Sequence, residues 1–270
     1  NEAVALLQTR PVMIPDFYLL GDGKTGEAVV VERTPKRLYL RRSKDMIGLA
    51  NHALAPELQG DKANERLKTY LTSGARYQRM MELLQQNRGI IDPRKALEML
   101  RDKRGVGGEP LALGNRNALD ALIATHSVVV DATSRVLGVG AGPHALGRYV
   151  AFDLRRELLG DERQAPADLP EDPVLHSSEY QAYLTAQTTL KAGELLQQKG
   201  EHTRAIEEAE RAVALQPQLP EARRLLGDLL TRRAQPGDRE RARREYQTFL
   251  ETQPPYLKDV EAVRAILKGL

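Results

Sequence analysis

The sequence contains no cysteine among its 270 residues. Disulfides, thiolate metal sites and a cysteine nucleophile on this chain are therefore excluded. No apolar run is long enough to span a bilayer, so we expect no membrane span. The formal net charge is only +3, and the basic residues alternate with acidic and apolar ones. A nucleic-acid-binding protein would need a clustered basic face instead, so we predict no nucleic-acid partner.

What the sequence does contain is typical of a globular chain with more than one part. Hydrophobic residues make up 41% and charged residues 29%, and the length allows one large domain or two smaller ones. Near residues 155–178 the composition changes from β-rich segments to helical ones. We predict an α+β domain over residues 1–158, a polar, proline-containing linker over 159–176 and an all-α domain over 177–270.

The N-terminal part alternates strand-like and helical stretches. Helical spacing of apolar residues predicts a helix over 64–86, interrupted at Ser73-Gly74, and a second helix over 92–103 with Asp92 as its N-cap. The strands are short, rich in β-branched and aromatic residues and separated by turn residues, and the first three predict an antiparallel meander. They cover residues 16–22, 27–34, 37–43, 124–131, 135–142 and 148–154.

Small residues recur in the C-terminal part at a period of about 34 positions. Gly193 and Gly227 are 34 residues apart, whereas Pro217 and Pro254 are 37 apart, which indicates a three-residue insertion in the second unit. Small residues let paired helices approach closely, and the proline ends the second helix of each pair. This period is typical of tetratricopeptide repeats, whose groove binds peptides or proteins. The alternative is two unrelated amphipathic helical hairpins.

The stretch GDGKTG, residues 21–26, ends like a phosphate-binding loop. Such a loop needs a further glycine five positions before Gly23, where this chain has Tyr18, and a helix after it. A strand follows instead. We therefore predict a hairpin turn in which Asp22-Gly23 and Gly26 supply positive-φ positions.

Other candidate sites fail the same kind of test. The stretch GVGAGPHALG (138–147) resembles a dinucleotide fingerprint, but Pro143 replaces its third glycine and another strand follows, so we predict a turn. The histidines show no metal-ligand spacing, and no Gly-x-Ser-x-Gly elbow is present. We predict neither a metal site nor a cofactor.

Two short stretches leave their function open. LANHALAPEL (49–58) places Asn51 directly after a predicted strand, either as a turn residue or as an amide that could stabilise an oxyanion. TSGARYQRMMEL (72–83) places Arg76 and Arg79 on one side of a helix, either as surface residues or as a functional pair. Spacing alone favours the turn and the surface arginines.

In order, these stretches resemble the isopenicillin N acyltransferase family, and more distantly penicillin V acylase and bile salt hydrolase. The resemblance covers about residues 1–155 and rests on EAVALLQTR, DFYLLGDGKTGEAVVVE, NHAL, SGARYQRMMELL, IATHSVVVD and VLGVGAGPHALGRYVAFDL. It implies an N-terminal-nucleophile (Ntn) hydrolase fold, a four-layer αββα sandwich of two stacked sheets. Here that sandwich would be followed by the tetratricopeptide-like module.

The resemblance also implies a chemistry. Family members cut themselves, or lose a leader, to expose a Cys whose own α-amino group serves as base. The Cys attacks an amide or thioester substrate, and water or an amine resolves the acyl-enzyme. Asn51 matches the asparagine of the family's oxyanion hole, and Arg76 matches an arginine near the nucleophile.

The missing cysteine is the main departure from the family. The stretch resembling EAVALLQTR lies well after the Cys in the family, so we expect the nucleophile to lie on another chain or an upstream segment. The chain would then be the larger part of an amide hydrolase or acyltransferase. The alternative is a nonenzymatic binding module, in which the repeats recruit a partner and the β-rich domain is a scaffold.

Overall fold

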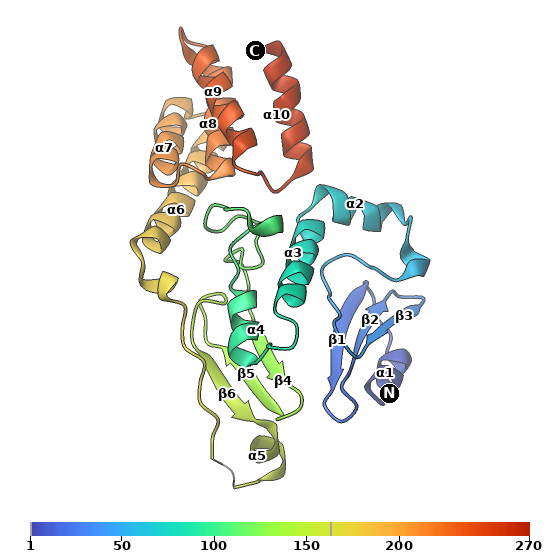
Figure 1. Cartoon of the computed structure of the whole chain (residues 1–270). Helices are drawn as coiled ribbons and strands as arrows, with labels where there is room; N and C mark the ends of the chain where they lie inside the picture. Colours follow the sequence, from blue (N-terminus) through green and yellow to red (C-terminus); the bar gives the residue numbers. More distant parts are fainter. Residues whose placement is uncertain (1, 163) are drawn as a thin grey trace. The chain divides into compact units, whose positions relative to one another are not determined.

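The computed structural model describes residues 2–162 and 164–270, which form two compact units (Figure 1). The first unit consists of Asn1–Asp102 and Ala124–Asp172, and the second of Lys103–Ile123 and Pro173–Leu270. The fold is α+β: two three-stranded antiparallel sheets lie in the first unit, and a run of packed helices makes up most of the second. The second unit therefore includes a segment from the middle of the chain.

The first sheet has the predicted meander order, β1-β2-β3, with antiparallel pairing throughout. Alternation along β2 places Val29 and Val31 on the face that Val4 of the first helix covers, and all three are buried. Burial of this apolar cluster holds the helix on the sheet. The elements are α1 (Glu2–Thr9), β1 (Asp16–Asp22), β2 (Glu27–Arg33) and β3 (Leu38–Ser43).

GDGKTG forms the turn between β1 and β2, as predicted. The amide of Gly26 donates to the carbonyl of Asp22 over 2.9 Å, and Gly26 has a φ of 68°. The prediction was wrong for Asp22 and Gly23, neither of which has a positive φ. Glycine is needed there for space, because a Cβ at position 23 would lie 2.0 Å from the carbonyl oxygen of Ala132.

The helices after the first sheet begin close to the predicted positions. The predicted helix over 64–86 is interrupted, as expected, but at Leu71, where the chain is extended, and not at Ser73-Gly74, which begin the next helix. Asp92 caps its helix as expected, accepting a hydrogen bond from the amide of Lys95 over 2.7 Å. The elements are η1 (Pro56–Leu58), α2 (Lys62–Tyr70), α3 (Ser73–Gln86) and α4 (Pro93–Leu100).

In the second sheet, of order β4-β5-β6, helix α4 covers one face. Leu97 of α4 packs against Val129 and Tyr149. The register places only apolar side chains on the opposite face, which we call the open face; Val128 and Val130 there are 51% and 56% exposed. The open face consists of Val128, Val130, Leu137, Val139, Val150 and Phe152. The strands, shorter than predicted, are β4 (Val128–Asp131), β5 (Val136–Gly140) and β6 (Tyr149–Asp153).

The segment between the sheet and the helical unit is partly ordered against the sheet. It follows α5 (Leu154–Leu159) and ends in the short helix η3 (Pro173–His176). Within it, Leu169 forms an isolated antiparallel bridge with Tyr149 of β6, with both amide–carbonyl hydrogen bonds made. The residues predicted as a linker therefore include a piece that extends the sheet edge, while residue 163 lies outside the described residues.

The described residues of the second unit include five α-helices, and each packs against the next. The two glycines of the 34-residue period lie where helices are close: a Cβ on Gly227 would be 2.7 Å from the Tyr246 ring, and one on Gly193 would be 3.2 Å from Leu225. The helices are α6 (Ser178–Gln198), α7 (His202–Leu215), α8 (Pro220–Arg233), α9 (Asp238–Glu251) and α10 (Leu257–Gly269). Among the described residues, none of the helices is long and apolar enough to cross a membrane.

The segment 103–123 packs on these helices with little regular structure of its own. The side chain of Gln216 donates to the carbonyl of Leu113 over 2.9 Å, and that of Asn115 donates to the carbonyl of Gln253 over 3.2 Å. Leu122 of the segment is 2% exposed. The helical unit thus buries apolar side chains from a segment that precedes it in the sequence by many residues.

Candidate functional site

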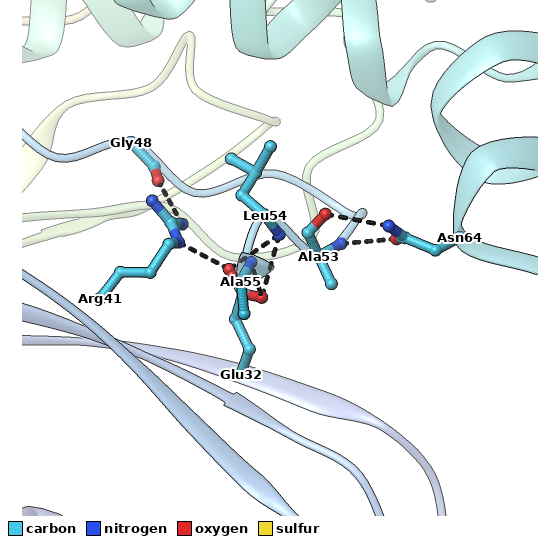
Figure 2. A network of polar contacts seen from close by, with 7 residues as sticks. All are labelled: Glu32, Arg41, Gly48, Ala53, Leu54, Ala55 and Asn64. Atoms are coloured by element: carbon cyan, nitrogen blue, oxygen red, sulfur yellow. Dashed lines mark hydrogen bonds and ion pairs between the residues drawn. The ribbon is translucent and has the colours of Figure 1, made fainter. Parts of the chain in front are cut away.

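The loop that carries Asn51 is held in place by a buried carboxylate (Figure 2). Glu32 of β2 is fully buried, and its carboxylate accepts hydrogen bonds from the amides of Leu54 and Ala55 over 2.8–3.0 Å. Arg41 of β3 donates to the same carboxylate over 2.7 Å and also to the carbonyl of Gly48 over 2.9 Å. A buried charge of this kind is tolerated only when it is paired and hydrogen-bonded, as it is here.

A second side chain, from a residue that follows the loop in the sequence, also holds the loop in place. Asn64 of α2 accepts from the amide of Ala53 over 2.7 Å and donates to the carbonyl of Ala53 over 3.0 Å (Figure 2). Asp61 caps α2 by accepting from the amide of Asn64 over 2.8 Å. The loop around residues 53–55 is therefore tied both to the first sheet and to α2, so its backbone has little freedom.

His52 fixes the start of α3 to this loop. It is 1% exposed, its Nδ1 lies 2.7 Å from Oγ of Ser73, and its ring packs edge-on against Tyr77. Burial, with a further contribution from Lys68, lowers the pKa of His52, so the ring is neutral at pH 7. The His–Ser distance would suit a nucleophile and its base, but Ser73 is only 3% exposed. The pair is therefore structural.

Asn51 and Arg76, the two predicted site residues, meet beside this buried support. Nη2 of Arg76 donates to Oδ1 of Asn51 over 2.7 Å. A guanidinium has no acceptor atom, so the oxygen of the amide must face Arg76. The Nδ2 group of Asn51 is left as the donor, and Asn51 is exposed, so this donor is accessible.

Arg79, the second arginine of the predicted pair, does not join this site. It is buried and makes a bidentate ion pair with Asp102, at 2.8 and 3.0 Å, with Glu82 as a further partner at 3.3 Å. The hydrogen bond that Arg79 donates to Asp102 raises the pKa of Arg79. The arrangement anchors α3 to the residues directly after α4.

Sequence reasoning missed the residues that support the site: Glu32, Asn64 and Ser73. Only Glu32 left a signal, as a charged residue at the end of the apolar run in EAVVVE. Its role depends on a loop more than 20 positions away, which no local pattern reveals.

A cavity of about 680 Å³ lies elsewhere in the first unit, and neither Asn51 nor Arg76 lines it. It is bounded by the GDGKTG turn and by the turn between β4 and β5, with Lys24, Glu27 and Arg135 among its lining residues. Charges of both signs line it. Within residues 2–162 and 164–270, no three or more His, Asp or Glu side chains are grouped so that they could hold a metal ion.

No protein-family model, curated protein or solved structure matches this chain. The geometry of the Asn51–Arg76 pair and its support is therefore what any assignment of function has to rest on.

Proposed function

We propose that the first unit belongs to an amide-bond hydrolase or acyltransferase of the Ntn type. It would act through an acyl-enzyme on an N-terminal Cys that another chain or segment carries, because this chain has no cysteine. Asn51 would donate to the oxyanion of the tetrahedral intermediate. The observation that carries the proposal is the hydrogen bond from Arg76, which turns the oxygen of the Asn51 amide away and leaves its N–H donor accessible.

Oxyanion stabilisation works only when the donor is held in place before the reaction begins. The loop that carries Asn51 meets this requirement, since Glu32 and Asn64 fix its backbone at positions 53–55. Arg76 would act on Asn51 as a positioning residue. Its charge could also orient a substrate carboxylate, since charge-assisted hydrogen bonds are the stronger ones.

The open face supports the finer proposal of a four-layer αββα sandwich. A helix, α4, covers one face of the second sheet, and the other face exposes the apolar side chains of three strands. Sheets in a sandwich bury such a face against a second sheet about 10 Å away. Exposed contiguous apolar patches generally mark surfaces that another element or partner covers. The further strands of the proposed enzyme would do so here.

The decisive experiment combines this chain with the segment or chain that carries the nucleophile and measures turnover of N-acyl amides and acyl thioesters. Asn51→Ala should lower kcat by about 100- to 1,000-fold, the usual cost of removing one oxyanion donor. Circular dichroism should show an unchanged fold, because Asn51 is exposed. Asn87→Ala, which removes an amide at the C-terminus of α3, serves as the matched control. Unchanged turnover in Asn51→Ala would rule out the proposed role.

For the second unit we propose tetratricopeptide-like repeats that recruit a polypeptide. A cavity of about 670 Å³ supports this role; it is lined by Tyr183, Gln187 and Lys191 of α6 and by Glu221 of α8. Panning a random peptide library against the full chain should enrich sequences that the Gln187→Trp variant, with its cavity filled, no longer enriches. Equal enrichment by both proteins would contradict the recruiting role.

A further inference from the structure

Two adjoining cavities of the second unit form one trough. The larger, about 670 Å³, and the smaller, about 270 Å³, share Glu194 of α6, Glu221 of α8 and Tyr256 at the start of α10 as lining residues. Arg116 and Lys191 line the larger cavity only, whereas Arg224, Asp228 and Asp259 line the smaller only. The smaller cavity therefore has four carboxylates and one cationic side chain.

Three charged side chains of the smaller cavity, Arg224, Asp228 and Asp259, already interact with one another. Arg224 pairs with Asp259 and lies 3.7 Å from Asp228. Asp228 also accepts a hydrogen bond from the hydroxyl of Tyr246 over 2.7 Å. The only cation of the smaller cavity is thus occupied by two carboxylates, which makes this cavity unsuitable for an anionic ligand.

Glu221 and Glu194 are the carboxylates left over, since no ion pair or side-chain hydrogen bond joins either to another described residue. Burial raises the pKa of Glu221, and the nearby Asp259 and Glu194 act in the same direction. A hydrogen bond from its own backbone amide and the nearby Arg116 oppose this shift. A half-buried carboxylate without an ion-pair partner costs folding free energy, even when its own backbone amide donates to it. A cation that entered the cavity would remove this cost by pairing with it.

We infer that the smaller cavity binds an ammonium or guanidinium group, contributed by a lysine or arginine side chain of a bound polypeptide. The group pairs with Glu221, with Glu194 beside it, and Tyr256, whose aromatic ring is of the kind that attracts cations, also lines the cavity. This inference deepens the proposed recruiting role and rests on it for the ligand being part of a polypeptide.

The distribution of charged residues along the trough indicates which of the two cavities the cation occupies. In the larger cavity Arg116 and Lys191 balance the shared Glu194 and Glu221, whereas the smaller cavity carries excess negative charge. The basic side chain therefore enters next to Asp228 and Asp259, and the rest of the bound polypeptide follows α6 toward Tyr183.

The test uses three acetylated pentapeptide amides with alanine at every position except the centre, which is lysine, norleucine or glutamate. Each is titrated into the full-length chain and followed by ¹⁵N–¹H spectra. The lysine peptide should shift the amide signals of Glu194, Glu221 and Asp259. It should also bind at least about tenfold more tightly than the norleucine peptide, the usual effect of a hydrogen bond to a charged group.

Glu221→Gln should abolish this preference for lysine over norleucine. Glu240→Gln is the matched control, because Glu240 occupies the first turn of α9, is exposed and lines neither cavity. Glu221→Gln should also unfold at a higher temperature at pH 7, since it removes a desolvated charge, so loss of binding cannot be ascribed to misfolding.

Each other outcome overturns the inference. Equal binding of the lysine and norleucine peptides, or a lysine preference that survives Glu221→Gln, would show that no cation site exists. Tighter binding of the glutamate peptide would overturn the cation site while leaving the recruiting role in place. If none of the peptides binds, the cation site is overturned, and the panning experiment alone decides the recruiting role.

Discussion

Nη2 of Arg76 lies 2.7 Å from Oδ1 of Asn51, although the two residues are 25 positions apart in the sequence. The contact joins the loop after β3 to the first turn of α3. It also determines the direction of the amide, because the oxygen is the only acceptor atom of the Asn51 amide. Because of this hydrogen bond, Oδ1 of Asn51 has a structural role, and Nδ2 is the atom that could donate to a reacting group.

Asn51→Asp tests this separation directly. The carboxylate keeps an acceptor for Arg76 and adds a charge to the pair, so we expect the free energy of unfolding to stay within about 1 kcal/mol of the parent. The N–H donor is lost, so turnover in the complemented enzyme should fall as far as in Asn51→Ala. Urea unfolding and kcat are measured on the same preparations. Activity close to that of the parent would mean that Asn51 donates no hydrogen bond to the reacting group.

Glu32→Gln should destabilise the first unit by about 3 kcal/mol, because it breaks a buried ion pair and weakens two loop hydrogen bonds. Glu32 is 0% and Arg41 18% exposed at the side chain. The control on the same strand is Glu27→Gln. Glu27 pairs with Arg42 over the same 2.7 Å, but the side chains are 29% and 36% exposed, so the cost should be under about 1 kcal/mol.

Hydrogen exchange at the amides of Leu54 and Ala55 shows whether the loop itself loosens, apart from any loss of stability in the whole unit. Both amides should exchange faster in Glu32→Gln than in Glu27→Gln, since only Glu32 accepts from them. Equal costs for the two variants would show that the buried carboxylate does not hold the loop.

Gly23→Ala should destabilise the first unit by about 1–3 kcal/mol, because the new methyl group would overlap the carbonyl oxygen of Ala132 at 2.0 Å. Gly21→Ala is the matched control. A Cβ there would lie 3.8 Å from the Cβ of Ala132, an ordinary contact, and we expect little change. Chemical denaturation measures both. If Gly23→Ala is as stable as the control, the two turns do not approach each other as the structure describes.

Asp238 should make the second unit sensitive to acid. It accepts from Nε and Nη2 of Arg233 over 2.8 and 2.6 Å and from the amide of Gln235 over 3.0 Å. These bonds, that of Arg233 first, lower the pKa of Asp238 from 3.8 to about 2. Because the folded pKa lies below the unfolded one, the stabilisation is complete above pH 3.8 and is lost as the pH falls toward about 2.

Asp238→Asn should therefore lower the unfolding temperature at pH 7, and the difference from the parent should shrink between pH 4 and pH 2. Thermal unfolding followed by circular dichroism over this range provides the measurement. Glu240→Gln, on the exposed side of the same helix turn, should change little at either pH. A difference that stays constant with pH would show that the Asp238 carboxylate does not make this contribution.

Much of the secondary structure could be predicted from local patterns. Alternating apolar residues and turn residues defined β1–β3, and Asp92-Pro93 located the start of α4, because caps and strand periodicity depend only on neighbouring residues. The site was predictable only in part. Asn51 and Arg76 were singled out, but their contact, and the support from Glu32 and His52, depend on segments that are distant in sequence.

The sequence by itself determined the absence of cysteine, the division into an α+β region and a helical region, and the 34-residue spacing of Gly193 and Gly227. Only the tertiary structure decided which way the Asn51 amide faces, that the segment 103–123 packs with the helical unit, and that Glu221 is half-buried without an ion-pair partner. The physical reason is the range of the interactions. Helix and strand preferences act over a few residues, whereas burial and ion pairing are set by whichever side chains folding brings together.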